Sequence, residues 1–131
     1  MYPGAALVFG LSADPVHRGH VEMVAQSFEG LNDRGYSPAQ VVMVPVYRRN
    51  PVGSAKERLT KTYHHRYVMC GLAARQIAWR LGFPGSAVVV SDVEAQLAAG
   101  RDRPNYTAET LSYLKIRSQL NRRLIFLISS E

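Results

Sequence analysis

Two histidines, His17 and His20, stand three residues apart in the segment His-Arg-Gly-His. Side chains at this spacing share one side of a helical turn, so we expect both imidazoles to face the same ligand. Gly19 between them is expected to let a bulky ligand approach the main chain. Imidazoles at a helix start, where main-chain N–H groups point outward, suit a phosphate whose charge grows during phosphoryl transfer. The alternative is a pair of cap residues bonded only to the backbone.

The surrounding elements predict a βαβ protein. Short apolar runs predict four strands, and apolar residues at helical spacing predict three helices. The expected strands are 5–10, 41–44, 87–90 and 124–128, and the expected helices are 19–31, 63–81 and 107–120. Strands that are apolar throughout belong in a sheet covered on both faces. We therefore expect an α/β fold, a Rossmann-like parallel sheet with helices on both faces, in a single domain over residues 1–131.

The helical spacing also predicts which side chains are buried. Buried positions are expected at Val21, Val24, Ala25, Phe28 and Leu31 in the first helix, and at Val68, Leu72, Ile77 and Leu81 in the second. Trp79 is expected in the core or between helices, and Cys70 is expected to be an inert core residue.

Composition excludes several classes of protein. The single cysteine excludes an intrachain disulfide framework and a Cys-rich zinc site. No apolar run approaches the roughly 20 residues of a membrane helix, and no basic segment precedes an apolar stretch at the N-terminus. We expect a cytoplasmic protein without a membrane partner.

The net charge of +6 fits capture of phosphate-bearing molecules, a solvated basic surface or nucleic-acid binding. Because no nucleic-acid motif accompanies the charge, we do not expect a nucleic-acid partner.

The segment 10–20, Gly-Leu-Ser-Ala-Asp-Pro-Val-His-Arg-Gly-His, resembles the signature of the HxGH nucleotidylyltransferases. It is most similar to that of the nicotinate- and nicotinamide-nucleotide adenylyltransferases, which reads G-G-[ST]-F-D-P-V-H-x-G-H. Segment 103–111, Arg-Pro-Asn-Tyr-Thr-Ala-Glu-Thr-Leu, resembles the family's R-x-S-Y-T-x-D-T-L. A third match joins His65-Arg66 to Met69 and Leu72-Ala73, like the family's H-R-x-x-M-x-x-L-A.

The resemblance implies adenylyl transfer from ATP to nicotinate mononucleotide or nicotinamide mononucleotide, which forms the dinucleotide and pyrophosphate. It assigns catalysis to His17 and His20 and phosphate contact to Ser12. Gly10, Leu11 and Gly19 belong to the same ATP-binding loop. Mg²⁺ is the expected cofactor, bridging the polyphosphate, and we predict no metal cage made of protein side chains.

Other segments at the ligand edge of the sheet are expected to contribute. The resemblance places Arg49 or Lys56, in the basic loop after the second strand, against phosphate. It places Asp92, Tyr106 and Thr107 at the mononucleotide. The family often has a stacking aromatic residue where this chain has Val93, and Tyr106 is the expected substitute. His65 and Arg66 match a pair that braces the site.

The chain also departs from the family pattern. Leu11 and Ala13 replace a glycine and an aromatic residue, and Ser129-Ser130-Glu131 stands where the family has G-A-D. The later I-S-S-T-x-x-R motif is absent, so we expect the fold to lack the family's C-terminal part. Two alternatives follow: another HxGH nucleotidylyltransferase, acting on a phosphopantetheine or cytidylyl substrate, or a non-catalytic nucleotide-binding module.

Overall fold

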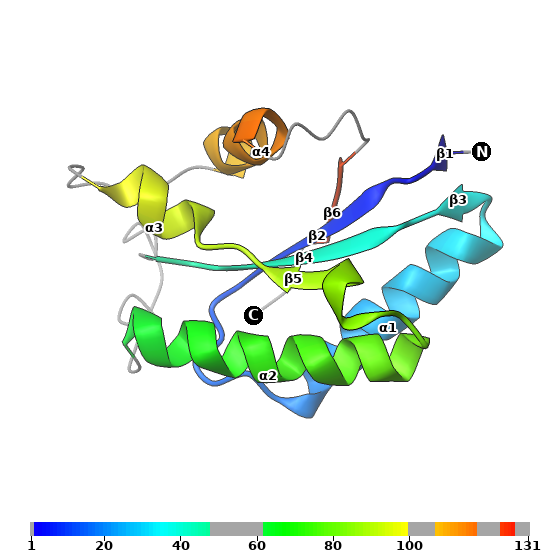
Figure 1. Ribbon diagram of the computed structural model, residues 1–131, viewed down its shortest axis with the longest axis horizontal. Coiled ribbons are helices and arrows are strands. Elements are labelled where there is room, and N and C mark those ends of the chain that lie inside the picture. Colours follow the sequence, from blue (N-terminus) through cyan, green and yellow to red (C-terminus); the bar gives the residue numbers. More distant parts are fainter. Residues whose placement is uncertain (1, 48–61, 100–106, 118–123, 128–131) are drawn as a thin grey trace, which may run out of the picture.

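The computed structural model contains a four-stranded parallel sheet with helices on both faces (Figure 1). It describes residues 2–47, 62–99, 107–117 and 124–127. The strands are β1 (Tyr2–Pro3), β2 (Ala6–Leu11), β3 (Tyr36–Ser37), β4 (Gln40–Pro45), β5 (Val88–Val90) and β6 (Leu124–Leu127). The helices are α1 (Arg18–Asp33), α2 (Tyr63–Leu81), the 3₁₀ helix η1 (Gly85–Ala87), α3 (Val93–Ala98) and α4 (Thr107–Arg117).

The strand order of the main sheet is β5-β4-β2-β6, and all pairs are parallel. The chain moves from β2 outward to β4 and β5, then returns to the other side of β2 for β6. In sheets of this type, ligands bind beyond the carboxyl ends of the strands, where the order reverses. That point lies beside β2, whose carboxyl end leads into the His17 segment. The predicted α/β, Rossmann-like fold is confirmed, and β1 pairs with β3 in an additional small sheet.

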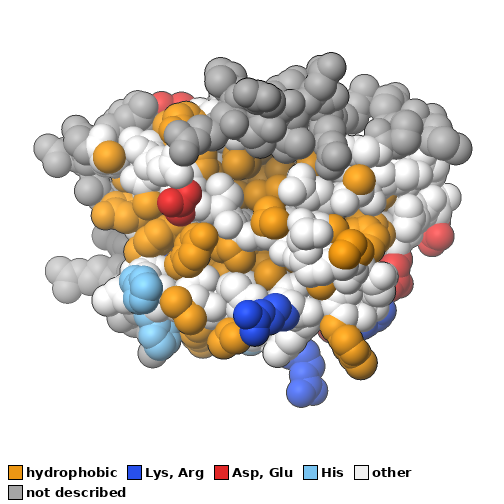
Figure 2. Space-filling model, in the orientation of Figure 1, with side chains coloured by type: hydrophobic (Ala, Val, Ile, Leu, Met, Phe, Trp, Pro, Cys, Tyr) orange, Lys and Arg blue, Asp and Glu red, His pale blue; other side chains and the backbone are white. Residues whose placement is uncertain are grey.

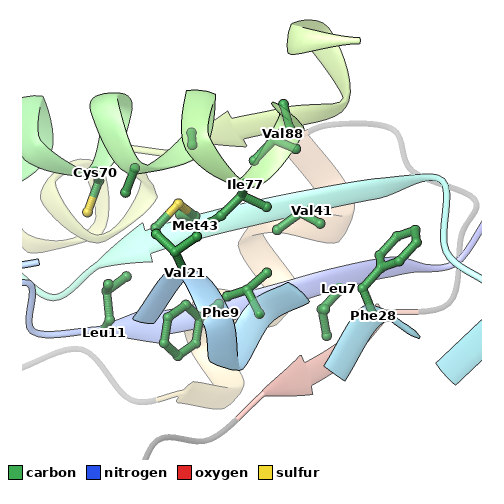
Figure 3. Packing of buried hydrophobic residues seen from close by; sticks show 14 of the residues in the cluster. Leu7, Phe9, Leu11, Val21, Phe28, Val41, Met43, Cys70, Ile77 and Val88 are labelled. Atoms are coloured by element: carbon green, nitrogen blue, oxygen red, sulfur yellow. The ribbon is translucent and has the colours of Figure 1, made fainter. Parts of the chain in front are cut away.

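The first core lies between the sheet and the helices α1 and α2. Alternate side chains of β2 point to opposite faces, and Leu7 and Phe9 enter this core with Val41 and Met43 of β4. Figure 3 shows Ile77 of α2 directed at the same layer. The second core lies on the opposite face, where apolar strand residues meet α3 and α4; its buried members are Val8, Val42, Val44, Val93 and Leu114. Helices therefore cover both faces, as predicted.

The predicted burial of α2 is wrong for its largest apolar residues. Val68 is 48% exposed, Leu72 56% and Trp79 86%. Apart from Arg66 and Ile77, the helix buries only small side chains: Cys70, Ala73, Ala74 and Ala78. These small side chains at i, i+3, i+4 and i+8 let the helix lie close to the sheet, and Val68, Leu72 and Trp79 lie on its outer side. Cys70 is buried, as predicted.

Some predicted boundaries also change. The segment after β5 contains the short helix α3, which the apolar spacing did not predict. The strand β4 includes Pro45, one residue beyond the predicted strand 41–44. Residue 128, the predicted end of the last strand, lies outside the described residues. Among the described residues, no helix is both long enough and apolar enough to cross a membrane.

Candidate active site

The loop that joins β2 to α1 begins at the central strand of the sheet. Gly10 lies beside β6, and a Cβ atom there would lie 3.2 Å from Cζ of Phe126. Leu11 is buried in the first core, and its main-chain oxygen accepts a hydrogen bond from the N–H of Val46. Ala13 is fully buried and has a φ of 57°, in the left-handed region that non-glycine residues seldom adopt. The loop thus turns sharply from the strand toward the histidines.

The two histidines form a reciprocal cap at the start of α1. His17 is the N-cap, and its Nδ1 accepts a hydrogen bond of 3.1 Å from the main-chain N–H of Gly19. In return, Nδ1 of His20 accepts a 3.0 Å hydrogen bond from the main-chain N–H of His17. The imidazoles stack with their centroids 3.8 Å apart and their planes 29° apart. The prediction that both rings share one side of the helix start is confirmed.

These hydrogen bonds decide which ring nitrogens can donate. An imidazole nitrogen that accepts a hydrogen bond carries no proton, so in each neutral ring the proton is on Nε2. His17 is exposed, whereas His20 is 1% exposed. The pair therefore combines the cap arrangement with two Nε2–H donors at the carboxyl end of β2. Such donors suit an anion.

Gly19 makes room for the imidazole of His17. A Cβ atom on Gly19 would lie 2.8 Å from Cε1 and 2.9 Å from Nδ1 of His17. Real Cβ atoms essentially never come so close, so glycine is needed at this position to seat the ring. The approach of a ligand to the main chain of Gly19 stays a prediction.

Arg66 ties the β2–α1 loop to the end of β4. This side chain from α2 is 1% exposed. Its Nη1 donates to the main-chain oxygen of Ser12 at 2.9 Å and to that of Val46, and its Nη2 lies 3.5 Å from the oxygen of Tyr47. The implied brace is thus present for Arg66. His65 contributes its main-chain N–H to the Thr62 cap, and its own side chain is exposed.

Three tyrosines line the start of α2. The rings of Tyr47 and Tyr63 have centroids 5.2 Å apart, those of Tyr63 and Tyr67 6.0 Å, and the guanidinium of Arg66 lies 5.5 Å from the Tyr63 centroid. Burial of the Tyr63 hydroxyl raises its pKa well above the usual value, and the nearby charge of Asp92 raises it further. The tyrosine hydroxyl therefore stays protonated.

Polar contacts hold α3 against α4 on the other side of the sheet. Thr110 donates from Oγ1 to the carboxylate of Glu94, and both residues are buried. Near them, the hydroxyl of Tyr113 lies 3.0 Å from Oε1 of Gln96, whose amide group donates to Asp92. The start of α4, which contains the predicted mononucleotide segment, is therefore anchored to the helix that follows β5.

The predicted site residues do not all meet at one point. Ser12 and His17 of the β2–α1 loop come together with Gly19 and His20 of the first turn of α1. Asp92 is exposed at the end of β5, two strands away from β2, about 10 Å across the sheet by strand spacing. Thr107 begins α4. The remaining predicted residues, Arg49, Lys56 and Tyr106, lie outside the described residues.

The described part of the chain contains no group of three or more His, Cys, Asp or Glu side chains that could hold a metal ion. The two imidazoles use Nδ1 for the main chain, so Nε2 is the ring nitrogen left for a ligand, and in His20 this atom is buried. A divalent ion at this site would have to bring most of its oxygen ligands with it.

Comparison with known proteins gives a consistent result. No family model matches the chain. A probable nicotinate-nucleotide adenylyltransferase from a Nitratiruptor species is 27% identical over 126 residues, which are 95% of this chain and 58% of that protein. The chain resembles the nicotinate-nucleotide adenylyltransferases. The resemblance predicted from segment 10–20 is therefore confirmed.

A solved structure gives the same fold. The Plasmodium falciparum nicotinic acid mononucleotide adenylyltransferase, complexed with NaAD, superposes with a TM-score of 0.63 at 20% identity. The match covers 93% of this chain and 50% of that one. The chain thus spans between half and three fifths of the length of the adenylyltransferases it matches.

The structure adds one feature that the sequence patterns did not reveal. It is the buried pair of Glu94 and Thr110, which lie 16 positions apart. For the histidines, the structure shows the backbone contacts of the alternative interpretation, since His17 and His20 cap the start of α1 reciprocally. An N-cap residue followed three positions later by a side chain that can accept is the pattern of a capping box.

Proposed function

We propose that this chain transfers the adenylyl group of ATP to a pyridine mononucleotide, with nicotinate mononucleotide as the favoured acceptor. The observation that carries the proposal is the stacked pair of His17 and His20 at the carboxyl end of β2. Their Nδ1 atoms accept from the main chain, so their protons are on Nε2. The names of the similar proteins support nicotinate over nicotinamide at the acceptor.

The reaction requires positioning and charge stabilisation and no covalent enzyme intermediate. An oxygen of the mononucleotide phosphate attacks the α-phosphorus of ATP and forms a new P–O bond. The bond from that phosphorus to the bridging oxygen breaks, and pyrophosphate leaves with the electron pair. Negative charge grows on the leaving and equatorial oxygens. The Nε2–H groups of His17 and His20 would donate to these oxygens, together with the main chain at the start of α1.

Other residues would place the substrates. Arg66 orients the carbonyl oxygens of Ser12 and Val46 toward itself, and so turns them away from an anion. Ser12 would contact phosphate through its N–H or hydroxyl group. The proposed mononucleotide residues remain Asp92, Tyr106 and Thr107, and the proposed contacts from the basic loop remain Arg49 or Lys56.

Mg²⁺ would enter as its complex with ATP, because the described residues offer the ion no cluster of side-chain ligands. When bound, the ion would neutralise part of the polyphosphate charge. The protein's own contribution would be the imidazole donors and the α1 terminus.

The direct experiment measures pyrophosphate release from ATP and Mg²⁺ with nicotinate mononucleotide, nicotinamide mononucleotide and phosphopantetheine as separate acceptors. A parallel reaction replaces ATP with CTP. We expect release with a pyridine mononucleotide and ATP, and the fastest release with the nicotinate form. Release with phosphopantetheine or CTP alone would reassign the chain to another HxGH activity. ATP binding without release under every condition would contradict the enzymatic proposal and favour a binding module.

A further inference from the structure

Three tyrosine side chains gather at the carboxyl ends of β4 and β5. Tyr47 follows the last residue of β4 by two positions, and the hydroxyl of Tyr67 donates a 3.3 Å hydrogen bond to the main-chain oxygen of Val90, which ends β5. The ring of Tyr63 lies beside both of the other rings, and we call the three the tyrosine cluster. In Figure 2, hydrophobic side chains (orange, a class that includes tyrosine) lie next to histidines (pale blue) at the end of the molecule where Figure 1 places the start of α2. The tyrosine cluster therefore lies at the ligand edge of the sheet.

The hydroxyl of Tyr63 differs from the polar groups around it. It is buried and has no hydrogen-bond partner in the described part of the chain. The hydroxyl of Tyr67 is bound to the main chain of β5, and the guanidinium of Arg66 is held by main-chain oxygens. The carboxylate of Asp92 accepts from the side-chain amide of Gln96. A buried hydroxyl without a partner costs free energy, and a ligand that accepts its hydrogen bond would recover that cost.

The protonation state of Tyr63 decides what kind of group it can bind. Burial raises the pKa of its hydroxyl and the charge of Asp92 raises it further, whereas the charge of Arg66 lowers it. The net shift is upward, so the hydroxyl keeps its proton at neutral pH and can donate to an oxygen of a ligand. A negatively charged oxygen forms a stronger hydrogen bond with such a donor than a neutral oxygen does.

The position of Tyr63 in the fold indicates which substrate it would meet. In sheets of this type, a dinucleotide lies across the point where the strand order reverses, with one half on each side. The histidine pair lies at that point, beside β2, and the tyrosine cluster lies toward β4 and β5. Strand spacing separates these two strands from β2 by roughly 5–10 Å. Asp92, a proposed mononucleotide residue, follows β5 on the same side, so Tyr63 would face the acceptor mononucleotide and not ATP.

We propose that Tyr63 is a specificity-determining residue for the acceptor, and that its hydroxyl donates a hydrogen bond to the carboxylate on the pyridine ring. This role rests on the proposed function. The side chain as a whole is only half-buried, so its rotation can turn the hydroxyl toward a ligand. Side-chain rotations are common on binding, and a hydroxyl without a partner breaks no hydrogen bond when it turns. The carboxamide of the nicotinamide form offers a neutral oxygen, so the same donor favours the nicotinate form.

The test compares Tyr63→Phe with Tyr67→Phe, which remove the same hydroxyl from neighbouring rings. Calorimetric titration measures how the full chain and each variant bind nicotinate mononucleotide, nicotinamide mononucleotide and ATP. We expect Tyr63→Phe to bind nicotinate mononucleotide about tenfold to hundredfold more weakly than the wild type, and nicotinamide mononucleotide about twofold to tenfold more weakly. Its affinity for ATP should not change. Tyr67→Phe should bind all three ligands as the wild type does.

Urea denaturation without ligand distinguishes the two hydroxyls in the free chain. Tyr67→Phe removes a hydrogen bond to β5, so its denaturation midpoint should fall below that of the wild type. Tyr63→Phe removes a buried hydroxyl that has no partner among the described residues, so its midpoint should equal or exceed that of the wild type. A lower midpoint for Tyr63→Phe would show that the hydroxyl already has a partner in the free chain, and would overturn the proposal.

Failure of this role for Tyr63 can be told from failure of the proposed function, because binding is measured without turnover. Unchanged affinity of Tyr63→Phe for nicotinate mononucleotide, or an equal loss in Tyr67→Phe, would overturn the role of Tyr63 alone. An equal loss of affinity for ATP would do the same, because Tyr63 would then not select the acceptor. A wild type that binds the mononucleotides but releases no pyrophosphate would overturn adenylyl transfer and leave the role of Tyr63 standing. A wild type that binds neither mononucleotide would overturn both.

Discussion

Nη1 of Arg66 donates a 2.9 Å hydrogen bond to the main-chain oxygen of Ser12, which lies 54 positions earlier in the chain. The same guanidinium donates to Val46 at the end of the neighbouring strand β4. One buried side chain therefore fixes the distance between two loops at the ligand edge of the sheet. A guanidinium can do this because its donors point in several directions within one rigid plane.

Arg66→Met is expected to lower the free energy of unfolding by about 3 kcal/mol, because buried carbonyl oxygens that lose a partner cost about 1–3 kcal/mol each. Arg66→Lys keeps the charge but cannot span both loops, so it should recover only part of the loss. Urea denaturation measures both values. Equal stability of the Met variant and the wild type would show that the bridge has no net effect.

Gly19→Ala is expected to disturb His17 without unfolding α1. The new methyl group would lie 2.8 Å from the imidazole and would displace it. Gly30→Ala is the matched control in the same helix, since its Cβ would meet only Nη1 of Arg34, at 3.9 Å. We expect the control to gain about 0.5–1 kcal/mol from helix propensity and to retain activity. Thermal unfolding and pyrophosphate release should show a loss of activity for Gly19→Ala alone.

Glu94 and Thr110 form the buried contact that joins α3 to α4. Thr110→Val removes the donor and leaves a buried carboxylate with one bond fewer, at an expected cost of about 1–3 kcal/mol. Glu94→Gln keeps an oxygen that can accept from Thr110, so it should cost less than Thr110→Val. A double-mutant cycle by chemical denaturation measures the coupling. A coupling energy near zero would show that the two side chains act independently.

The sequence predicted the order and type of the main elements because their signals are local. One apolar run follows Pro3, another precedes Pro45, and Gly82 ends the helix α2. Interactions between residues close in the chain determine where such elements begin and end. The prediction of which α2 side chains are buried was wrong for a different reason. Hydrophobicity alone favours Leu72 and Trp79 as core residues, whereas the close approach of helix to sheet selects Ala73 and Ala74.

The candidate site was predictable only in part. The spacing of His17 and His20 indicated a shared direction, and the structure stacks the rings. The role of Gly19 could not be predicted, because it depends on the side-chain rotamer that His17 adopts as an N-cap. The Glu94–Thr110 contact depends on how α3 and α4 pack on the sheet, and no spacing rule in a sequence predicts a pair of this kind.

Cys70 makes the free energy of unfolding depend on pH in the alkaline range. Burial raises the pKa of its thiol from 9.0 to about 12, although the charge of Arg66 opposes the shift. The unfolded chain therefore releases this proton at lower pH than the folded one. The contribution to stability is complete below pH 9 and is lost as pH rises toward 12, by about 1.4 kcal/mol per pH unit. The stability difference between the wild type and Cys70→Ala, measured by denaturation from pH 7 to about 10.5, should move in favour of the variant above pH 9. A constant difference would contradict the assignment.

The capping and the proposed catalytic roles of the histidines can be separated by substitution. Asparagine is a good N-cap, and glutamine three positions later can accept from the N-cap N–H, as His20 does here. The double variant His17→Asn/His20→Gln should therefore keep the start of α1, and its circular dichroism spectrum and unfolding free energy should change little. It lacks both Nε2–H donors, and each lost donor is expected to reduce kcat by about 10²–10³. His17→Ala is the complementary control, because it loses the cap as well, at about 1 kcal/mol. If pyrophosphate release by the folded double variant equals that of the wild type, the imidazoles serve only to cap the helix, and the proposed chemistry must lie elsewhere in the chain.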